Sequence, residues 1–405
     1  MKGQEKEGVA LPTASQQARR RRILVLTSFY LPGVKGGGPI RSIAGLVEQL
    51  GTQLDLYILC RDRDLGDTQP YAGIKAGEWI EFGNATVQYL ERSEFTSRRY
   101  QKLLHELNPD VVYLNTLFSH REFIVPVLVA MRSPRSVDIV VAPRGCLDPG
   151  ALALKPTKKR IYLRILRSST LPRRLIWQAT NAEEAEAIRE AVGSVRTIIA
   201  PNLPSPPPAF SFARHHKEPG SLRVIFLSRI SPKKNLQFLL ERMARIRGHI
   251  ELTVAGPIED ADYWERSRRF AAYALKHVEI SKIGTIPHDE ISGIMSSHHI
   301  FALPTLGENF GHVILEASDA GLGLLISDRT PWHGLSEIGA GWEIPLEQPT
   351  EWEAALQQCV DMENSVFERM STSARALRQS LFDLPAARRD TLALFGAAGS
   401  SEETR

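Results

Sequence analysis

Short runs of apolar residues alternate with amphipathic stretches along most of the chain. Apolar runs of this length, bounded by turn residues, predict buried strands. In the first half we predict strands at residues 23–27, 54–60, 86–90, 111–114, 139–142 and 174–178, and helices at 40–50 and 98–107. Strands that alternate with helices are typical of parallel α/β layering.

A proline cluster interrupts this rhythm once. Residues 201–208 read Pro-Asn-Leu-Pro-Ser-Pro-Pro-Pro, which neither a helix nor a central strand tolerates. After it we predict strands at 224–227, 251–255, 278–283, 300–303 and 323–327, and helices at 236–245, 264–275, 288–297 and 313–320. The pattern therefore predicts two open parallel α/β domains on either side of a cleft, where such sheets bind ligands.

The length of 405 residues agrees with two domains, because single cores stop growing below this size. We predict a flexible basic tail, a first domain, a Pro-rich linker, a second domain, and a C-terminal helix with a frayed tail, at residues 1–21, 22–200, 201–220, 221–378 and 379–405. The hydrophobic fraction of 43% and the charged fraction of 24% are those of an ordinary globular protein.

The cysteine content and the hydropathy indicate the cellular compartment in which we expect the protein. Cys60, Cys146 and Cys359 are scattered and lack metal-ligand spacing, which fits a reduced, cytoplasmic protein. No apolar run approaches the roughly 20 residues of a membrane-spanning helix. The basic residues 19–22 and the apolar residues after them imitate a signal peptide, but no small-residue cleavage site follows.

The net charge of +4 is modest, but basic residues concentrate between positions 150 and 180, where no Asp or Glu occurs. The cluster consists of Lys155, Lys158, Lys159, Arg160, Arg164, Arg167, Arg173 and Arg174. A solvated helix face is one interpretation, but like charges repel unless an anion is near, so we favour an anionic surface partner. Sparse aromatics argue against single-stranded nucleic acid and favour anionic lipid headgroups or a phosphorylated lipid.

Two carboxylates define the first candidate site. Glu308 lies in a glycine-bracketed turn after the predicted strand 300–303, and Glu316 lies eight positions later in the helix that the turn opens. Free amides at a helix start, together with the helix dipole, attract phosphate. Two turns of helix advance about 11 Å, so each carboxylate could accept hydrogen bonds from hydroxyls on either side of a diphosphate. Two solvated glutamates on a surface helix remain the alternative.

Two other loops follow predicted strands. Arg229 and Lys234 lie after the strand 224–227, where an arginine fork and a lysine could hold a diphosphate and stabilise its leaving charge. Gly36, Gly37 and Gly38 follow the first strand, where backbone amides could approach phosphate. The glycines match neither a dinucleotide fingerprint, in which Arg41 would occupy the third glycine's place, nor a P-loop. Each loop alone could also be a simple soluble turn.

Together these motifs resemble the retaining nucleotide-sugar glycosyltransferases of family four, which have the GT-B fold. The resemblance spans nearly the whole chain, and its most specific element is Glu308 and Glu316 with Asn309, Phe310 and Gly311 between them. The segments 114–119, 142–147, 151–159, 330–332 and 341–342 are similar to a bacterial exopolysaccharide or capsule-type branch of that family.

The resemblance implies a role for each position. It implies that Glu308 contacts hydroxyls of the donor sugar, that Glu316 binds the ribose, and that Arg229 and Lys234 hold the diphosphate. The stretch around Ile286 would face the nucleobase. In the family's mechanism the leaving phosphate helps to deprotonate the acceptor hydroxyl, which attacks from the same face, and neither a cofactor nor a metal is required.

One position departs from the family's pattern. Many relatives carry a histidine just past the fourth strand, where this chain has Asn115, and His120 five residues on could replace it near the donor sugar. We assign Arg144, Lys155, Lys158 and Lys159 to the acceptor side, because acceptors in such pathways are often sugars on a polyprenyl diphosphate at the membrane face. The protein would then work in the cytoplasm, at the inner face of the membrane.

Other function classes remain open. A non-catalytic nucleotide-sugar-binding scaffold or a nucleotide-sugar isomerase could share the fold and the four charged residues. A glycoside hydrolase would need its two carboxylates across one scissile bond, about 5–10 Å apart, beside no phosphate site. The resemblance therefore predicts a hexosyltransferase that uses a nucleotide diphosphate sugar and a saccharide acceptor.

Overall fold

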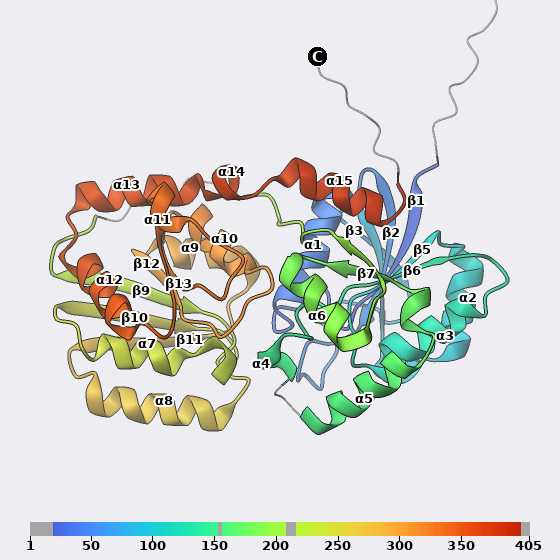
Figure 1. Cartoon of the computed structure of the whole chain (residues 1–405), viewed down its shortest axis with the longest axis horizontal. Coiled ribbons are helices and arrows are strands. Elements are labelled where there is room, and N and C mark those ends of the chain that lie inside the picture. Colours follow the sequence, from blue (N-terminus) through green and yellow to red (C-terminus); the bar gives the residue numbers. More distant parts are fainter. Residues whose placement is uncertain (1–18, 153–155, 208–215, 398–405) are drawn as a thin grey trace, which may run out of the picture.

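Two α/β domains lie side by side in the computed structural model, and a row of C-terminal helices runs along one side of both (Figure 1). The structure describes residues 19–152, 156–207 and 216–397. The predicted tail up to residue 18, Lys155, residues 208–215 of the predicted linker and the end after residue 397 lie outside the described residues. The predicted class of two parallel-sheet α/β domains is confirmed.

The first domain has a sheet in the order β3-β4-β2-β1-β5-β6-β7-β8, parallel except for the pair β3–β4. Its strands are β1 (Arg21–Leu26), β2 (Leu54–Arg61), β3 (Trp79–Phe82), β4 (Ala85–Leu90), β5 (Val111–Leu114), β6 (Asp138–Val141), β7 (Ile176–Ala179) and β8 (Arg196–Ile199). The interior strands are buried on both faces, as apolar runs without polar alternation predict.

Helices cover both faces of this sheet. They are α1 (Gly38–Leu50), α2 (Ser97–Leu107), α3 (Val125–Met131), α4 (Pro149–Leu152), α5 (Pro156–Ser168) and α6 (Ala182–Val192), with short helical turns at Arg92–Glu94, His120–Ile124 and Pro172–Arg174. Helix α1 packs with Ile23 and Val25 of β1, whereas α2, α3, α5 and α6 pack with Leu24 and Leu26 on the opposite face. Because successive side chains of a strand point to opposite faces, β1 contributes residues to both hydrophobic cores.

The structure corrects the sequence analysis at several places, and neither β8 nor the strand at residues 341–344 was predicted. Arg21, which we expected in the flexible tail, begins β1 and forms an ion pair with Asp138. Arg174, the predicted start of a strand, lies in the turn Pro172–Arg174, so β7 begins only at Ile176. The hairpin partner β3 was not predicted, although the Gly-Asn pair at 83–84 between β3 and β4 is a turn signal.

The second domain has a fully parallel sheet in the order β11-β10-β9-β12-β13-β14. Its strands are β9 (Ser221–Leu227), β10 (His249–Ala255), β11 (Val278–Gly284), β12 (Ile300–Leu303), β13 (Gly323–Ser327) and β14 (Gly341–Ile344). Its helices are α7 (Leu236–Met243), α8 (Ala261–Ala274), α9 (His288–Ser296), α10 (His312–Asp319), α11 (Leu335–Ile338) and α12 (Pro349–Asp361). One continuous hydrophobic core joins them.

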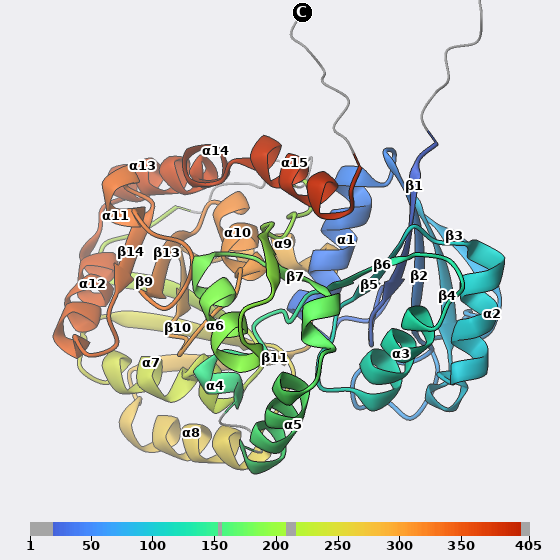
Figure 2. The ribbon, with the colours of Figure 1, turned by 45° about the vertical axis from the view of Figure 1, so that its right-hand side comes forward.

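The C-terminal helices connect the two domains. They are α13 (Asn364–Arg375), α14 (Leu377–Leu381) and α15 (Leu384–Leu394), and Figure 2 shows them passing from the second domain to the first. Ala387, Leu392 and Phe395 are buried in the core of the first domain, where the Phe395 ring meets Tyr113 at a centroid distance of 5.1 Å. Among the described residues, none of the helices is long and apolar enough to cross a membrane.

Candidate functional site

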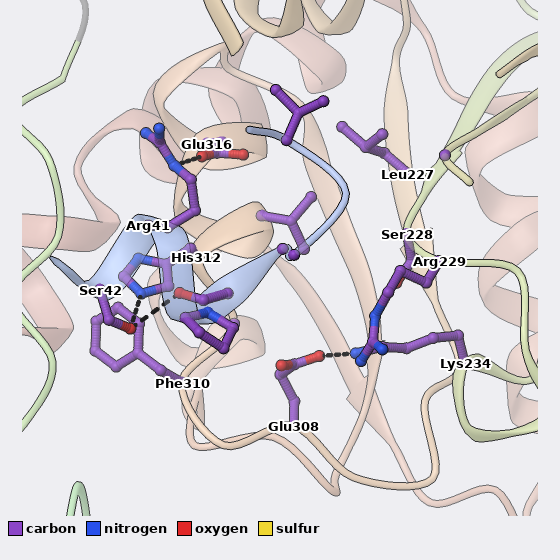
Figure 3. Close-up of a pocket in the computed structure, with 18 of the residues that line it drawn as sticks. Arg41, Ser42, Leu227, Ser228, Arg229, Lys234, Glu308, Phe310, His312 and Glu316 are labelled. Atoms are coloured by element: carbon purple, nitrogen blue, oxygen red, sulfur yellow. Dashed lines mark hydrogen bonds and ion pairs between the residues drawn. The ribbon is translucent and has the colours of Figure 1, made fainter. Parts of the chain in front are cut away.

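A cleft of about 330 Å³ lies where the carboxyl ends of the strands of both domains face each other (Figure 3). Loops that follow β1 and β6 line it on one side, and loops that follow β9, β10, β11 and β12 line it on the other. Among the described residues that line the cleft, the carboxylates are Glu308 and Glu316 and the cations are Lys35, Arg41, Arg144, Arg229, Lys233 and Lys234. The excess of cations favours an anionic ligand.

The loop after β9 brings Arg229 and Lys234 to the cleft. Gly256 after β10 allows this loop to come close, because a Cβ there would lie 2.0 Å from the Ser228 carbonyl oxygen. Arg229 Nη1 forms an ion pair with Glu259 Oε1 at 2.9 Å. A single helical turn, Pro232–Lys234, ends at Asn235 in the left-handed conformation (φ 58°) and leaves the Lys234 side chain buried in the cleft.

Glu308 lies directly opposite Lys234. The two side chains form a buried ion pair, and Figure 3 shows the Lys234 ammonium pointing at the carboxylate beside the Arg229 guanidinium. Burial acts to raise the pKa of the Glu308 carboxyl, but Lys234, Lys233 and Arg229 outweigh it and hold the pKa below its usual value. Glu308 is therefore a carboxylate at neutral pH, able to accept hydrogen bonds.

The turn between Glu308 and α10 is fixed by its surroundings. The backbone N–H of Glu308 donates to the Arg329 carbonyl at 2.9 Å, and Trp332 Nε1 donates to the Phe310 carbonyl at 2.5 Å. Gly311 has φ 79°, which an L side chain rarely adopts, and no side chain caps α10 there. The amides at the start of α10 consequently remain open toward the cleft, as an anion site requires.

A histidine at the start of α10 contacts the first domain. His312 Nε2 lies 3.0 Å from Ser42 Oγ of α1. Burial, together with the charges of Arg41 and Arg144, holds the pKa of His312 well below its usual range. The imidazole is therefore neutral at physiological pH and adds no charge beside the helix start.

Glu316 of α10 lies further along the cleft and forms an ion pair with Arg41 of the first domain. Arg41 Nε is 3.3 Å from Glu316 Oε1, and His288 Nδ1 is 3.8 Å from the same oxygen. Burial raises the pKa of Glu316 above its usual value, although Arg41 acts in the opposite direction. Two carboxylates of one cleft thus have pKa values displaced in opposite directions by their surroundings.

The predicted glycine loop lines the cleft beside α1. Gly37 has φ 66°, and Cβ atoms at Gly37 and Gly38 would have no heavy atom within 4 Å, so this backbone faces open space. Asp64 holds the loop, because its Oδ2 accepts hydrogen bonds from the backbone N–H groups of Val34 (2.6 Å) and Lys35 (2.9 Å). The loop is therefore pre-formed with its amides at the cleft.

Most residues predicted for the donor site meet in this cleft. Its lining includes Gly36, Gly37, Gly38, Arg229, Lys234, Ile286, Glu308, Asn309, Phe310, Gly311 and Glu316. Asn115 and His120 are not part of the lining. Asn115 is buried with its Oδ1 accepting from Arg144, and His120 is exposed at the start of a helical turn. Arg144 itself lines the cleft.

The predicted acceptor-side lysines lie elsewhere. Lys158 and Lys159 belong to α5, which does not line the cleft. Lys158 is exposed, whereas Lys159 Nζ donates to the Ala151 carbonyl at 2.6 Å and lies 5.1 Å from the centroid of the Phe118 ring. The two lysines therefore differ, because only Lys158 points to solvent.

Sequence reasoning missed the contacts between the domains. Arg41 with Glu316, Ser42 with His312, Thr180 with Asn309 and Asp148 with Lys233 all join the two sides of the cleft. The only signal was positional: Arg41 follows the glycine loop, and Lys233 precedes Lys234. Nothing in the order of residues indicates which opposite partner each would meet.

Comparisons with known proteins agree with this geometry. The profile of the family described as Glycosyl transferases group 1 matches residues 221–362, which form the second domain. The phosphatidylinositol N-acetylglucosaminyltransferase gpi3 subunit of Schizosaccharomyces pombe is 28% identical over 104 residues, which are 25% of this chain. The alignment spans 22% of that relative's length.

Solved structures match almost the whole chain. The Anabaena protein HepE in complex with UDP and glucose has a TM-score of 0.68 at 15% identity, over 93% of this chain and 100% of that one. Sucrose-phosphate synthase of Thermosynechococcus elongatus has a TM-score of 0.66 at 15% identity, over 93% and 98%. WaaG, a glycosyltransferase involved in lipopolysaccharide biosynthesis, has a TM-score of 0.60 at 13% identity, over 93% and 100%. These likenesses establish the GT-B fold.

Proposed function

We propose that this protein is a retaining glycosyltransferase that moves a hexose from a nucleotide diphosphate sugar to a saccharide acceptor. The observation that carries the proposal is the convergence of Arg229, Lys234, Glu308 and the open start of α10 in one cleft between two parallel-sheet domains. The family match of residues 221–362 supports the same activity. HepE, whose structure was solved with UDP-glucose, makes that sugar nucleotide the first donor to test.

The geometry gives each group a task in the transfer. The diphosphate binds between Arg229, Lys234 and the amides at the start of α10, so the charge that grows on the leaving phosphate meets preorganised donors. Glu316 accepts hydrogen bonds from the ribose, and Ile286 contacts the base. Glu308 and the amides of 309–311 hold the hexose hydroxyls.

The reaction then exchanges one C–O bond for another. The bond between the sugar's anomeric carbon and the phosphate oxygen breaks, and the acceptor oxygen bonds to that carbon on the same face. The acceptor's proton passes to the departing phosphate, which balances the charge, and attack on the same face retains the configuration. We propose no metal and no cofactor for this step, since cationic side chains supply the positive charge; turnover unchanged by excess EDTA is the expected result.

For the acceptor we propose a lipid-linked saccharide in cell-surface polysaccharide synthesis, used at the inner membrane face. Support comes from α5, which exposes Ile161 (57%) and Ile165 (67%) among the exposed cations Lys158, Arg160 and Arg164. An apolar pair surrounded by positive charge suits a surface of anionic lipid. The acceptor would reach the cleft from that surface.

Thermal-shift measurements with UDP-, GDP- and ADP-sugars test donor binding, because a ligand that binds only the folded state raises its Tm. Stabilisation by one nucleotide class is expected, and no shift with any of them would refute the donor site. Release of nucleoside diphosphate that depends on a lipid-linked acceptor identifies the transferase. A scaffold would bind without turnover, and an isomerase would convert the sugar nucleotide without any acceptor.

A further inference from the structure

Arg144 follows β6 in a left-handed backbone conformation, with φ 57°. This conformation is unfavourable for a non-glycine residue. It turns the side chain toward the end of β5, where Nε and Nη2 both donate to Asn115 Oδ1, at 3.1 and 2.9 Å. Nη2 also donates to the Tyr113 hydroxyl at 2.5 Å. The guanidinium is thus held firmly by two partners.

Both partners are neutral. The Tyr113 hydroxyl donates onward to Gln178, whose amide donates to the Ala200 carbonyl at 2.7 Å, so the chain of contacts runs into the sheet and contains no carboxylate. Among the described residues Arg144 forms no ion pair, and its Nη1 is buried without a hydrogen-bond partner. A half-buried cation with a buried, unpaired N–H group is costly unless an anion joins it.

The place for that anion is the cleft, which Arg144 and Gly145 line. The Gly145 backbone lies against the donor turn, because a Cβ on it would be 2.9 Å from Asn309 Cβ. Glu184 braces the contact: it accepts from the Gly145 N–H at 2.7 Å and from the Thr180 N–H at 2.8 Å, and the Thr180 hydroxyl donates to Asn309 Oδ1 at 2.9 Å. Arg144 therefore stands beside the turn that carries Glu308.

We propose that Arg144 is a catalytic residue of the first domain that contacts the diphosphate of the donor through Nη1. It gives the leaving phosphate a charge-assisted hydrogen bond from the side opposite Arg229 and Lys234. Asn115 and Tyr113 are positioning residues that aim the guanidinium. The inference rests on the proposed function and deepens it, because it assigns the first domain's contribution to the same site.

The proposed role of Arg144 also changes the role that we assign to Asn115. Its carboxamide does not line the cleft, but its oxygen receives two of the guanidinium's hydrogen bonds. Asn115 thus acts through Arg144. Replacing its amide by a carboxylate of the same shape would keep both hydrogen bonds and neutralise the charge, which separates geometry from electrostatics.

The test measures binding of UDP, GDP and ADP by calorimetry, and kcat with the best sugar nucleotide, for Arg144→Gln, Arg144→Lys and Asn115→Asp. Arg144→Gln is expected to weaken diphosphate binding about 10-fold to 100-fold, the range for a lost charged hydrogen bond. Arg144→Lys should retain part of the affinity. Asn115→Asp should lose affinity while its Tm equals or exceeds that of the wild type. The exposed Arg135→Gln, with the same change in charge, should have no effect.

Two results would refute the inference and are distinguishable. If the wild type binds a diphosphate and Lys234→Ala abolishes binding, while folded Arg144→Gln and Asn115→Asp bind and turn over normally, only the role of Arg144 is wrong. If the wild type binds none of the three diphosphates, the proposed function falls and the inference with it.

Discussion

Arg41 of α1 and Glu316 of α10 form an ion pair across the cleft, with Nε and Oε1 3.3 Å apart. The carboxylate proposed to bind a ribose therefore already has a cationic partner on the opposite domain, and both side chains are largely buried. A bound nucleoside must share Glu316 with Arg41 or replace it. Nucleotide binding and the contact between the domains are consequently coupled at this pair.

Glu316→Ala is expected to remove most of the thermal shift that the preferred nucleotide gives the wild type, because the ribose loses its acceptor. The loss should be at least about tenfold in affinity. Thermal-shift titration measures it. Glu337→Ala, an exposed carboxylate of α11, is the control and should keep the full shift. Equal shifts in both variants would contradict the role of Glu316.

The buried pair Lys234 and Glu308 should be strongly coupled in the ligand-free protein. Removing one partner leaves an uncompensated charge. The losses of stability in Lys234→Met and in Glu308→Gln should therefore sum to more than the loss in the double variant. We expect a coupling free energy of about 1–3 kcal/mol from urea unfolding of the four proteins in the cycle. Additive effects would mean that solvent screens the pair.

Gly37 and Gly38 form a matched test of the glycine loop. A methyl group added at either would have no heavy atom within 4 Å, but only Gly37 has positive φ. Gly37→Ala should therefore lose stability by about 1 kcal/mol from backbone strain, whereas Gly38→Ala should fold as stably as the wild type. If phosphate approaches this backbone, Gly38→Ala should still bind the nucleotide more weakly. Unchanged affinity in a stable Gly38→Ala protein would place the phosphates elsewhere.

His299 should make stability depend on pH. Burial, then the charges of Arg223 and Lys217, lower its pKa from 6.5 to about 3, and its Nδ1 accepts from the Arg223 N–H at 3.0 Å. Below pH 6.5 the unfolded state binds a proton that the folded state does not. The stability that the neutral ring contributes is complete above pH 6.5 and falls by roughly 1.5 kcal/mol on going to pH 5.

Urea unfolding at several pH values measures this slope. His299→Asn, whose side-chain oxygen can still accept from the Arg223 N–H, should flatten it. The exposed His277→Asn should leave it unchanged. Part of the slope should remain even in His299→Asn, because burial also lowers the pKa of His298 and His312. An identical slope in wild type and His299→Asn would exclude His299 as a source.

Helix α5 should bind anionic vesicles through charge and apolar contact together. Raising the salt to about 0.5 M should weaken binding, because surface attraction is screened. Replacing Ile161 and Ile165 by serine should weaken it further at low salt. Val366→Ser, an exposed apolar residue of α13, is the control. Co-sedimentation measures both effects, and binding that ignores salt and both isoleucines would refute this surface.

The sequence predicted the strands that carry the site, because apolar runs such as 300–303 report burial on both faces of a sheet. It also implied that Lys234 and Glu308 would serve the same ligand, and both follow strands of the same parallel sheet. It did not predict Arg41 beside Glu316, or Asn115 beneath Arg144. Periodicity indicates which face of an element is buried, but not which residue of another domain covers it.

The sequence also did not predict that α15 packs on the first domain, since its apolar residues could have packed on the core of either domain. This return means that the chain passes between the domains twice, and residues 204–207 and 380–385 lie around one hollow. Two chain connections at one edge restrain the domains as a hinge does. The opposite edge can open, whereas sliding and twisting of the domains are limited.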